Sequence, residues 1–298
     1  MTPPRSRKKA LKRLLPFPAV KSCTIITAIC LLTTILLATA QEPSPLKLSW
    51  PVETSLLVSG LAGQIIGQHR LAEMTPAGPN DLKKQDLAPW DKPFAGQYNA
   101  AASSASDVLV FAVGGAMVYA DIWDKTRPQS SWTPLLQDGV ILAEAFAWSS
   151  ALNLNVRALR IHPRPFVYDS TNGSSASERA APEAAGSFYS GHASEAFLGA
   201  AYFATVYPLR HPEFQHTGLL WGTSLTAATA VAVLRVASGK HFPSDVVAGA
   251  AIGTVLGWGF AKMHETSFGK DGGKFWSLQA WPQPGGFALQ GARSFAAL

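Results

Sequence analysis

Cysteine is nearly missing from this chain of 298 residues. The two that occur, Cys23 and Cys30, both lie in an apolar stretch near the N-terminus. A lipoprotein signal would need small residues just before its cysteine, and Cys30 follows Ile29, which argues against that kind of anchor. The rest of the chain can form no disulfide, so its stability must come from burial of a core.

Charged residues are also few, at 15% against 47% apolar residues. This balance is typical of a well-buried globule or a membrane-associated protein and excludes a disordered chain. No acidic residue precedes Glu42, whereas seven of the 25 basic residues fall in the first 21 positions, which leaves 18 basic against 19 acidic residues in the body. The net charge of +6 therefore belongs to the leader. It gives no support to nucleic-acid binding, which would need a basic patch on the body.

The first 40 residues have the pattern of an export signal. Their basic beginning is followed by an apolar stretch at 22–40 that ends in Ala38-Thr39-Ala40, which matches the A-x-A cleavage pattern. A stretch of this length could also remain as an anchor. We expect residues 1–40 to be a signal peptide or an N-terminal membrane anchor, and residues 41–298 to be one exported domain facing the periplasm.

None of the Ala/Gly/Leu-rich stretches of the body shows strict alternation of apolar and polar residues, the pattern of a half-buried strand. The sequence also contains no P-loop and no dinucleotide-binding fingerprint. Six Ala/Gly/Leu-rich stretches predict an all-α fold, a six-helix bundle; they lie at 54–68, 107–119, 139–156, 190–207, 217–236 and 244–263. Two apolar runs in the tail flank a Pro-Gln-Pro-Gly-Gly sequence and predict a short C-terminal hairpin packed on the bundle.

Long uncharged runs are scarce as well. Among the six Ala/Gly/Leu-rich stretches, only the one at 217–236 contains 18 residues without a charge, at 217–234, which is the usual threshold for a membrane span. Because Ala/Gly-rich helices pack closely both in water and in lipid, a soluble or peripherally attached body and an integral one are both open. The polar segment 71–106, with four prolines, is long for a structureless connector and is typical of a cap or a lid.

Three short segments contain an unusual set of polar side chains. Together they supply three guanidinium groups, a hydroxyl beside backbone N–H donors, and two histidines, one with a carboxylate four residues away. This set suits phosphoryl transfer through a phosphohistidine without a metal ion. The segments are Arg157-x6-Arg164-Pro165, Ser190-Gly191-His192 and Arg235-x5-His241-x3-Asp245.

The last segment is the most specific. If Pro243 opens a helix, His241 and Asp245 come together, and Asp245 would accept the Nδ1–H of His241, which leaves Nε2 as the free nucleophile. Arg235 would end the preceding helix and reach the same place. An incidental His–Asp pair at a helix start, with Arg235 only compensating a helix dipole, is the alternative.

The middle segment stands at the start of an apolar stretch. Ser190 as the N-cap residue and Gly191 after it would offer a hydroxyl and unblocked N–H groups to an anion. His192 in the first turn would face that anion, first as general acid for the leaving oxygen and then as general base for water. A plain serine cap with a surface histidine is the alternative.

The first segment supplies two arginines. Pro163 and Pro165 force an extended backbone, so Arg164 should be held on a stiff connector. The planar guanidinium grips phosphate oxygens with two parallel hydrogen bonds and stays charged. Taken alone, Arg157 or Arg164 could equally be a solvated surface charge.

The three segments together resemble the signature of the type 2 phosphatidic acid phosphatase superfamily, which also includes bacterial non-specific acid phosphatases and vanadium haloperoxidases. The family pattern is Lys-x6-Arg-Pro, Pro-Ser-Gly-His and Ser-Arg-x5-His-x3-Asp. The chain departs from it at three positions: Arg157 replaces lysine, Tyr189 replaces proline and Leu234 replaces serine. The resemblance covers about residues 139–263, the expected catalytic helices.

The resemblance implies an active site at the helix ends and a metal-independent phosphatase that needs no cofactor. His241 would attack phosphorus, Asp245 would orient it, and His192 would protonate the departing alcohol. The implied phosphate ligands are Arg157, Arg164, Ser190, Gly191 and Arg235.

We expect the substrate to be a phosphate monoester or diphosphate, lipid-linked, and the protein to be membrane-associated. Two alternatives are a vanadate-dependent haloperoxidase and a non-catalytic relative that binds phosphate or lipid. A metal enzyme built on His162, His192 and His241 would lack the usual ligand spacings.

Overall fold

The computed structural model describes residues 44–125, 133–266, 275–283 and 286–294. The leader at 1–40, and with it the choice between signal peptide and anchor, lies outside the described residues.

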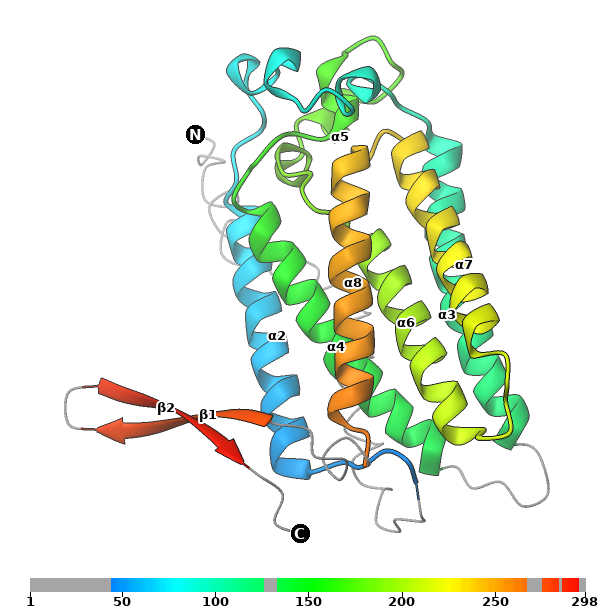
Figure 1. Ribbon diagram of the computed structural model, residues 1–298. Coiled ribbons are helices and arrows are strands. Elements are labelled where there is room, and N and C mark those ends of the chain that lie inside the picture. Colours follow the sequence, from blue (N-terminus) through cyan, green and yellow to red (C-terminus); the bar gives the residue numbers. More distant parts are fainter. Residues whose placement is uncertain (1–43, 126–132, 267–274, 284–285, 295–298) are drawn as a thin grey trace, which may run out of the picture. The chain divides into compact units, whose positions relative to one another are not determined.

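All six predicted helices form, and the fold is all-α (Figure 1). A short seventh helix, α5 (Ala176–Arg179), lies in the connection before the fourth long one. The six long helices are α2 (Trp50–Ala72), α3 (Ala100–Lys125), α4 (Thr133–Arg157), α6 (Gly191–Arg210), α7 (Thr217–Ala237) and α8 (Pro243–Met263).

The boundary between the connector and α3 differs from the prediction. Residues 100–106, expected in the connector, form the first two turns of α3. The Asn99 side chain accepts a hydrogen bond from the Ala102 N–H (3.0 Å), which satisfies one of the free donors at this helix start. The run of alanines and serines here resembled a loop because it has no large apolar residue.

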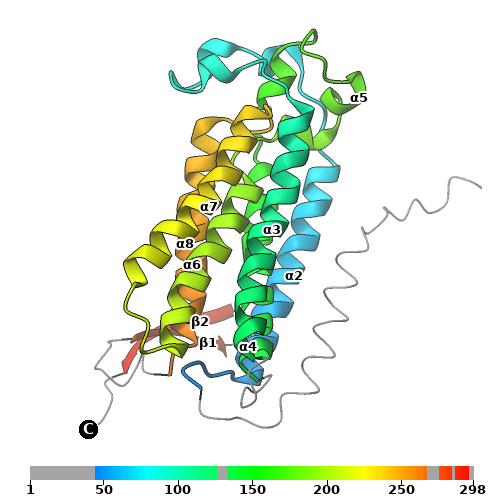
Figure 2. The same ribbon diagram turned by 90° about the vertical axis from the view of Figure 1, so that its right-hand side faces the viewer.

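Helix α6 lies at the centre of the bundle (Figures 1 and 2). It packs against α8, α7, α3 and α4, while α2 packs mainly on α4. Helix α6, which follows the N-cap residue Ser190, therefore packs against four of the other five long helices.

A stripe of three glycines brings α8 against the backbone of α6. A Cβ atom added at Gly249, Gly253 or Gly257 would lie only 2.5, 2.0 and 2.1 Å from carbonyl oxygens of α6 and its N-cap residue. No side chain separates the two helices along this line, so their N-terminal ends are held together. There the N–H of Ser190 donates to the carbonyl oxygen of Asp245 (3.0 Å).

The connector from 73 to 99 covers the end of the bundle at which α6 and α8 begin (Figure 1). It contains three short 3-10 helices: η1 (Pro79–Asp81), η2 (Lys84–Asp86) and η3 (Lys92–Phe94). The carboxylate of Asp91 accepts hydrogen bonds from the N–H (3.1 Å) and hydroxyl (2.6 Å) of Ser244, in the first turn of α8. The connector therefore has the position of a cap.

The tail forms the predicted hairpin. Strands β1 (Phe275–Gln283) and β2 (Gly286–Ser294) pair antiparallel, with Gln283 opposite Gly286 and Phe275 opposite Ser294. The packing of this hairpin on the bundle stays a prediction.

Two of the helices, α7 and α8, are long and apolar enough to cross a membrane. Only 28% and 33% of their most apolar windows are buried, whereas the core helix of a soluble protein is mostly buried. Large apolar side chains also point outward elsewhere, such as Ile65 on α2 (69% exposed) and Phe111 on α3 (78% exposed). This pattern favours association with a membrane.

Candidate active site

All eight predicted site residues lie at the end of the bundle covered by the connector. Arg157 is in the last turn of α4 and Arg235 in the last turn of α7. Ser190 is the N-cap residue of α6, and Asp245 lies in the first turn of α8. Arg164 precedes the 3-10 helix η4 (Pro165–Tyr168). Four helix ends thus bring together residues that are up to 88 positions apart.

The three arginines are close enough to repel one another. Burial and the charges of Arg164 and Arg235 lower the pKa of Arg157 to about 9. The Nε and Nη2 groups of Arg157 donate to the carbonyl oxygens of Gly186 (3.1 Å) and Glu183 (3.0 Å), so the backbone holds this guanidinium in place. Cations held together in this way favour the binding of an anion between them.

Arg164 and Arg235 have N–H groups available for a ligand. Both Nε atoms are buried and have no hydrogen-bond partner among the described residues. Burial also lowers the pKa of Arg164. Leaving a buried charged donor without an acceptor costs about 1–3 kcal/mol or more, so a ligand with several oxygens would stabilise both side chains.

The segment Ser190-Gly191-His192 takes the local structure predicted for it. The buried Ser190 hydroxyl accepts from the Ala193 N–H (3.4 Å), as an N-cap residue does. His192 follows in the first turn, partly exposed, with Nε2 2.9 Å from the Asp107 carboxylate. Burial and the charge of Arg235 lower the pKa of His192 to about 4, although Asp107 opposes this shift. Without an anion, His192 is neutral at pH 7.

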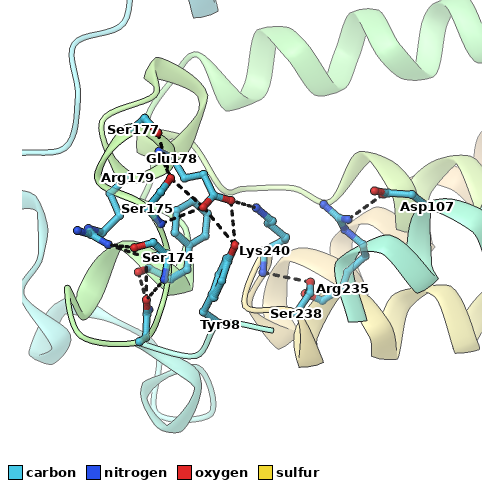
Figure 3. Close-up of polar contacts among 12 residues, drawn as sticks. Tyr98, Asp107, Ser174, Ser175, Ser177, Glu178, Arg179, Arg235, Ser238 and Lys240 are labelled. Atoms are coloured by element: carbon cyan, nitrogen blue, oxygen red, sulfur yellow. Dashed lines mark hydrogen bonds and ion pairs between the residues drawn. The ribbon is translucent and has the colours of Figure 1, made fainter. Parts of the chain in front are cut away.

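Asp107 is a site residue that the sequence reasoning missed. Its Oδ1 also lies 3.3 Å from Nη1 of Arg235 (Figure 3). The same Nη1 donates to the Ser106 hydroxyl (3.0 Å). One carboxylate of α3 therefore joins a predicted general acid to a predicted phosphate ligand. The available signal was a lone acidic residue at the start of an otherwise apolar stretch.

The predicted hydrogen bond from Nδ1 of His241 to the Asp245 carboxylate is wrong. The Nδ1 atom of His241 lies 3.0 Å from the main-chain oxygen of Ser187 and 3.6 Å from Oδ2 of Asp245, which is too long for a hydrogen bond. The reason is that α8 begins only at Pro243, after an extended Phe242, so His241 is not one helical turn below Asp245. We infer that Nδ1–H donates to Ser187, which leaves Nε2 unprotonated as before.

Asp245 instead connects the parts around His241. It is fully buried, and its Oδ2 accepts from the Ser187 hydroxyl (2.5 Å) and the Phe242 N–H (2.9 Å). Its Oδ1 lies 3.3 Å from Nε2 of His162. Asp245 thus positions His241 through Ser187. The sequence suggests His162 only as a metal ligand and does not single out Ser187.

Residues 138–268 match the model of the PAP2 superfamily, and this segment contains all eight site residues. The segment belongs to the PAP2 superfamily. No curated protein matches the chain.

One solved structure that matches is described as the first transmembrane PAP2 type phosphatidylglycerolphosphate phosphatase, from Bacillus subtilis. It is 17% identical, with a TM-score of 0.37, and the match covers 81% of this chain and 96% of that one. The superfamily match supports phosphatase activity for the site described above.

A fourth cation, Lys240, lies at the rim of the PAP2 site (Figure 3). Its Nζ is 3.6 Å from the Glu178 carboxylate and 4.6 Å from the centre of the Phe166 ring, and the Tyr98 hydroxyl donates to the same carboxylate (3.1 Å). Burial and the charge of Arg164 lower the pKa of Lys240. The side chains of Arg164 and Lys240 line a cavity of about 270 Å³. No motif in the sequence indicates this lysine.

Burial of His241 predicts a loss of stability in acid. Burial lowers the pKa of His241 to about 3 from an ordinary value of 6.5. Between these values the unfolded chain binds a proton that the folded chain does not, so stability falls as the pH falls, by up to about 1.4 kcal/mol per pH unit. We expect Tm to drop between pH 7 and pH 5, and to drop less in His241→Asn.

Thermal unfolding at both pH values measures this effect. His69→Asn is the control, because that side chain is 72% exposed. An equal acid-induced drop in wild type and His241→Asn would contradict the prediction.

Proposed function

We propose that the protein is a metal-independent phosphatase that hydrolyses a phosphate monoester or diphosphate through a phosphohistidine. One observation carries the proposal. Three guanidinium groups converge where α6 and α8 begin, and two of them have buried Nε donors without a partner among the described residues. A phosphate group supplies the oxygens and the negative charge that this arrangement lacks.

In the proposed mechanism, the substrate phosphate binds to Arg157, Arg164 and Arg235 and to the N-terminus of α6 at Ser190 and Gly191. These groups offset the charge on the equatorial oxygens. Nε2 of His241 then attacks phosphorus in line, so that a P–N bond forms while the P–O bond to the leaving group breaks.

His192 handles the protons in both steps. Its pKa is low in the free site, but a bound phosphate dianion favours the imidazolium, which then protonates the departing alkoxide. The neutral imidazole next removes a proton from water, and that water breaks the P–N bond and releases inorganic phosphate. Asp107 and Asp245 position the two histidines.

We further propose that the substrate is lipid-linked and that the enzyme acts in the cell envelope, facing the periplasm. The outward apolar side chains of α2, α3, α7 and α8 support membrane association. The basic leader with its A-x-A sequence supports export.

A panel of substrates tests this proposal. p-Nitrophenyl phosphate, phosphatidate and a polyprenyl diphosphate are offered to the purified protein in EDTA. We expect turnover to persist and to be highest with a lipid. Arg164→Gln should lower kcat/KM about 10²- to 10³-fold, because it removes a charged donor from the phosphate site. Arg70→Gln, an exposed arginine on α2, should have no effect.

Three outcomes would contradict the proposal. Activity lost in EDTA and restored by a divalent ion would indicate a metal enzyme. Bromide oxidation by peroxide with vanadate, without hydrolysis, would indicate a haloperoxidase. Phosphate binding without any turnover would indicate a non-catalytic relative.

A further inference from the structure

A second polar cluster lies at the opposite end of the bundle from the phosphate site. It consists of Glu53 in the first turn of α2, Glu144 in the first half of α4, and His264, the residue that ends α8. Their exposed fractions are 3%, 0% and 4%. Figure 1 shows that α2 and α4 begin, and α8 ends, on the side away from α5.

The distances in this cluster do not fit hydrogen bonds. Nε2 of His264 lies 3.5 Å from Oε2 of Glu53 and 3.7 Å from Oε2 of Glu144. These separations exceed the usual hydrogen-bond range. They approach the about 3.4 Å that separates two ligand atoms placed about 2.1 Å from a tetrahedral zinc ion.

Each residue presents a free ligand atom. Both carboxylate oxygens of Glu144, Oε2 of Glu53 and Nε2 of His264 are buried and have no hydrogen-bond partner among the described residues. The other side-chain atoms are engaged, because Oε1 of Glu53 accepts from the Ser49 N–H and Nδ1 of His264 lies 2.7 Å from the Phe260 carbonyl. A histidine that donates Nδ1–H to a carbonyl has its Nε2 lone pair available, as metal-bound histidines do.

The surroundings make a cation favourable. The buried side chains at this end include Leu46, Ile141 and Phe260, so the carboxylates lie in an apolar environment. Within the described chain, His264 is the one basic side chain that lies within ion-pair distance of either carboxylate. A divalent ion would compensate both carboxylates at once.

We propose that Glu53, Glu144 and His264 bind a divalent cation of the zinc type, with water as a fourth ligand. One imidazole nitrogen and two carboxylate oxygens within 4.8 Å of one another are a zinc-type ligand set. The site joins α2, α4 and α8. It also fixes residues 46–47, because the backbone N–H of Lys47 donates to the carbonyl oxygen of His264 (2.8 Å) and Leu46 forms an isolated antiparallel β-bridge with Glu265. The ion has a structural role and takes no part in phosphate hydrolysis.

Zinc uptake and thermal stability test the proposal. The full-length protein is stripped with a chelator, dialysed and titrated with zinc, and bound zinc and Tm are measured. We expect one zinc per chain and a rise in Tm. Glu144→Gln and His264→Gln should take up no stoichiometric zinc, and their Tm should not respond to it. His69→Gln removes an exposed histidine that lies 3.4 Å from Glu73, and it should behave as wild type.

A second measurement does not depend on the variants being folded. Cobalt(II) added to the stripped wild-type protein should give the intense visible absorption of a four-coordinate site, and zinc should abolish it. Weak octahedral bands, no stoichiometric metal in the wild type, or zinc retained in both folded variants would overturn the proposal. Initial phosphatase rates in EDTA report on the other end of the bundle, so the two proposals can fail separately.

Discussion

Replacement of His241 by alanine is expected to lower phosphatase turnover at least about 10⁴-fold, whatever the substrate. The reason is geometric and chemical. His241 is buried near Arg164 and Arg235, and the main-chain oxygen of Ser187 accepts a hydrogen bond from its Nδ1–H, so its Nε2 is the candidate nucleophile of the site. The other histidine at the anion site, His192, has its Nε2 2.9 Å from the Asp107 carboxylate and takes the role of general acid in the proposed mechanism. Loss of a covalent nucleophile leaves only the weak catalysis that binding alone provides.

The measurement is steady-state hydrolysis together with trapping of labelled enzyme in an alkaline denaturing quench. Wild type should form a phosphoenzyme that is stable in alkali and labile in acid, as a phosphohistidine is, and His241→Ala should form none. His216→Ala changes an exposed histidine just before α7 and should keep full activity. Circular dichroism establishes that the inactive variant is folded. Wild-type turnover in folded His241→Ala would exclude the phosphohistidine mechanism.

Replacement of Gly253 by alanine is expected to cost about 3 kcal/mol of unfolding free energy or more. The added Cβ would lie 2.0 Å from the Ser194 carbonyl oxygen and 2.9 Å from its Cα, both of which belong to the backbone of α6. A flexible side chain could move aside, but a helix backbone cannot move without separating α6 from α8. In a chain of this size the change should lower Tm by roughly 10 °C.

Helix α8 offers a matched control for this experiment. A Cβ at Gly259 would meet no atom within 4 Å, so Gly259→Ala should be neutral or stabilising by about 0.5–1 kcal/mol, since alanine is the better helix former. Thermal unfolding of the two variants compares them directly. Equal stability of Gly253→Ala and Gly259→Ala would show that the two helices are not in backbone contact at this point.

The helices could be predicted because apolar stretches of helical length are separated by proline and glycine. The prediction was wrong at 100–106, where alanine and serine form two helical turns without any large apolar residue. Here a polar cap at Asn99 and contacts with distant segments decide the structure. Such contacts leave no periodic pattern in a single sequence.

The candidate site shows the same difference between local patterns and contacts with distant segments. Spacing within each segment predicted which residues would carry phosphate chemistry, since spacing is a local property. The partners of those residues come from elsewhere in the chain. Ser187 lies 54 positions before His241, and Asp107 lies 128 positions before Arg235. Only the packing of α3, α6, α7 and α8 brings these groups together, so neither partner could be found by counting along one segment.

The acceptor that sets the tautomer of His241 is a main-chain oxygen. Every amino acid carries that atom, so a change of side chain at position 187 does not remove it. The acceptor for the proposed nucleophile thus survives a point mutation at position 187, whereas the hydroxyl that joins Ser187 to Asp245 does not. Homologues with another residue there would still present the same acceptor to the histidine, and a search for an invariant residue would pass over the position.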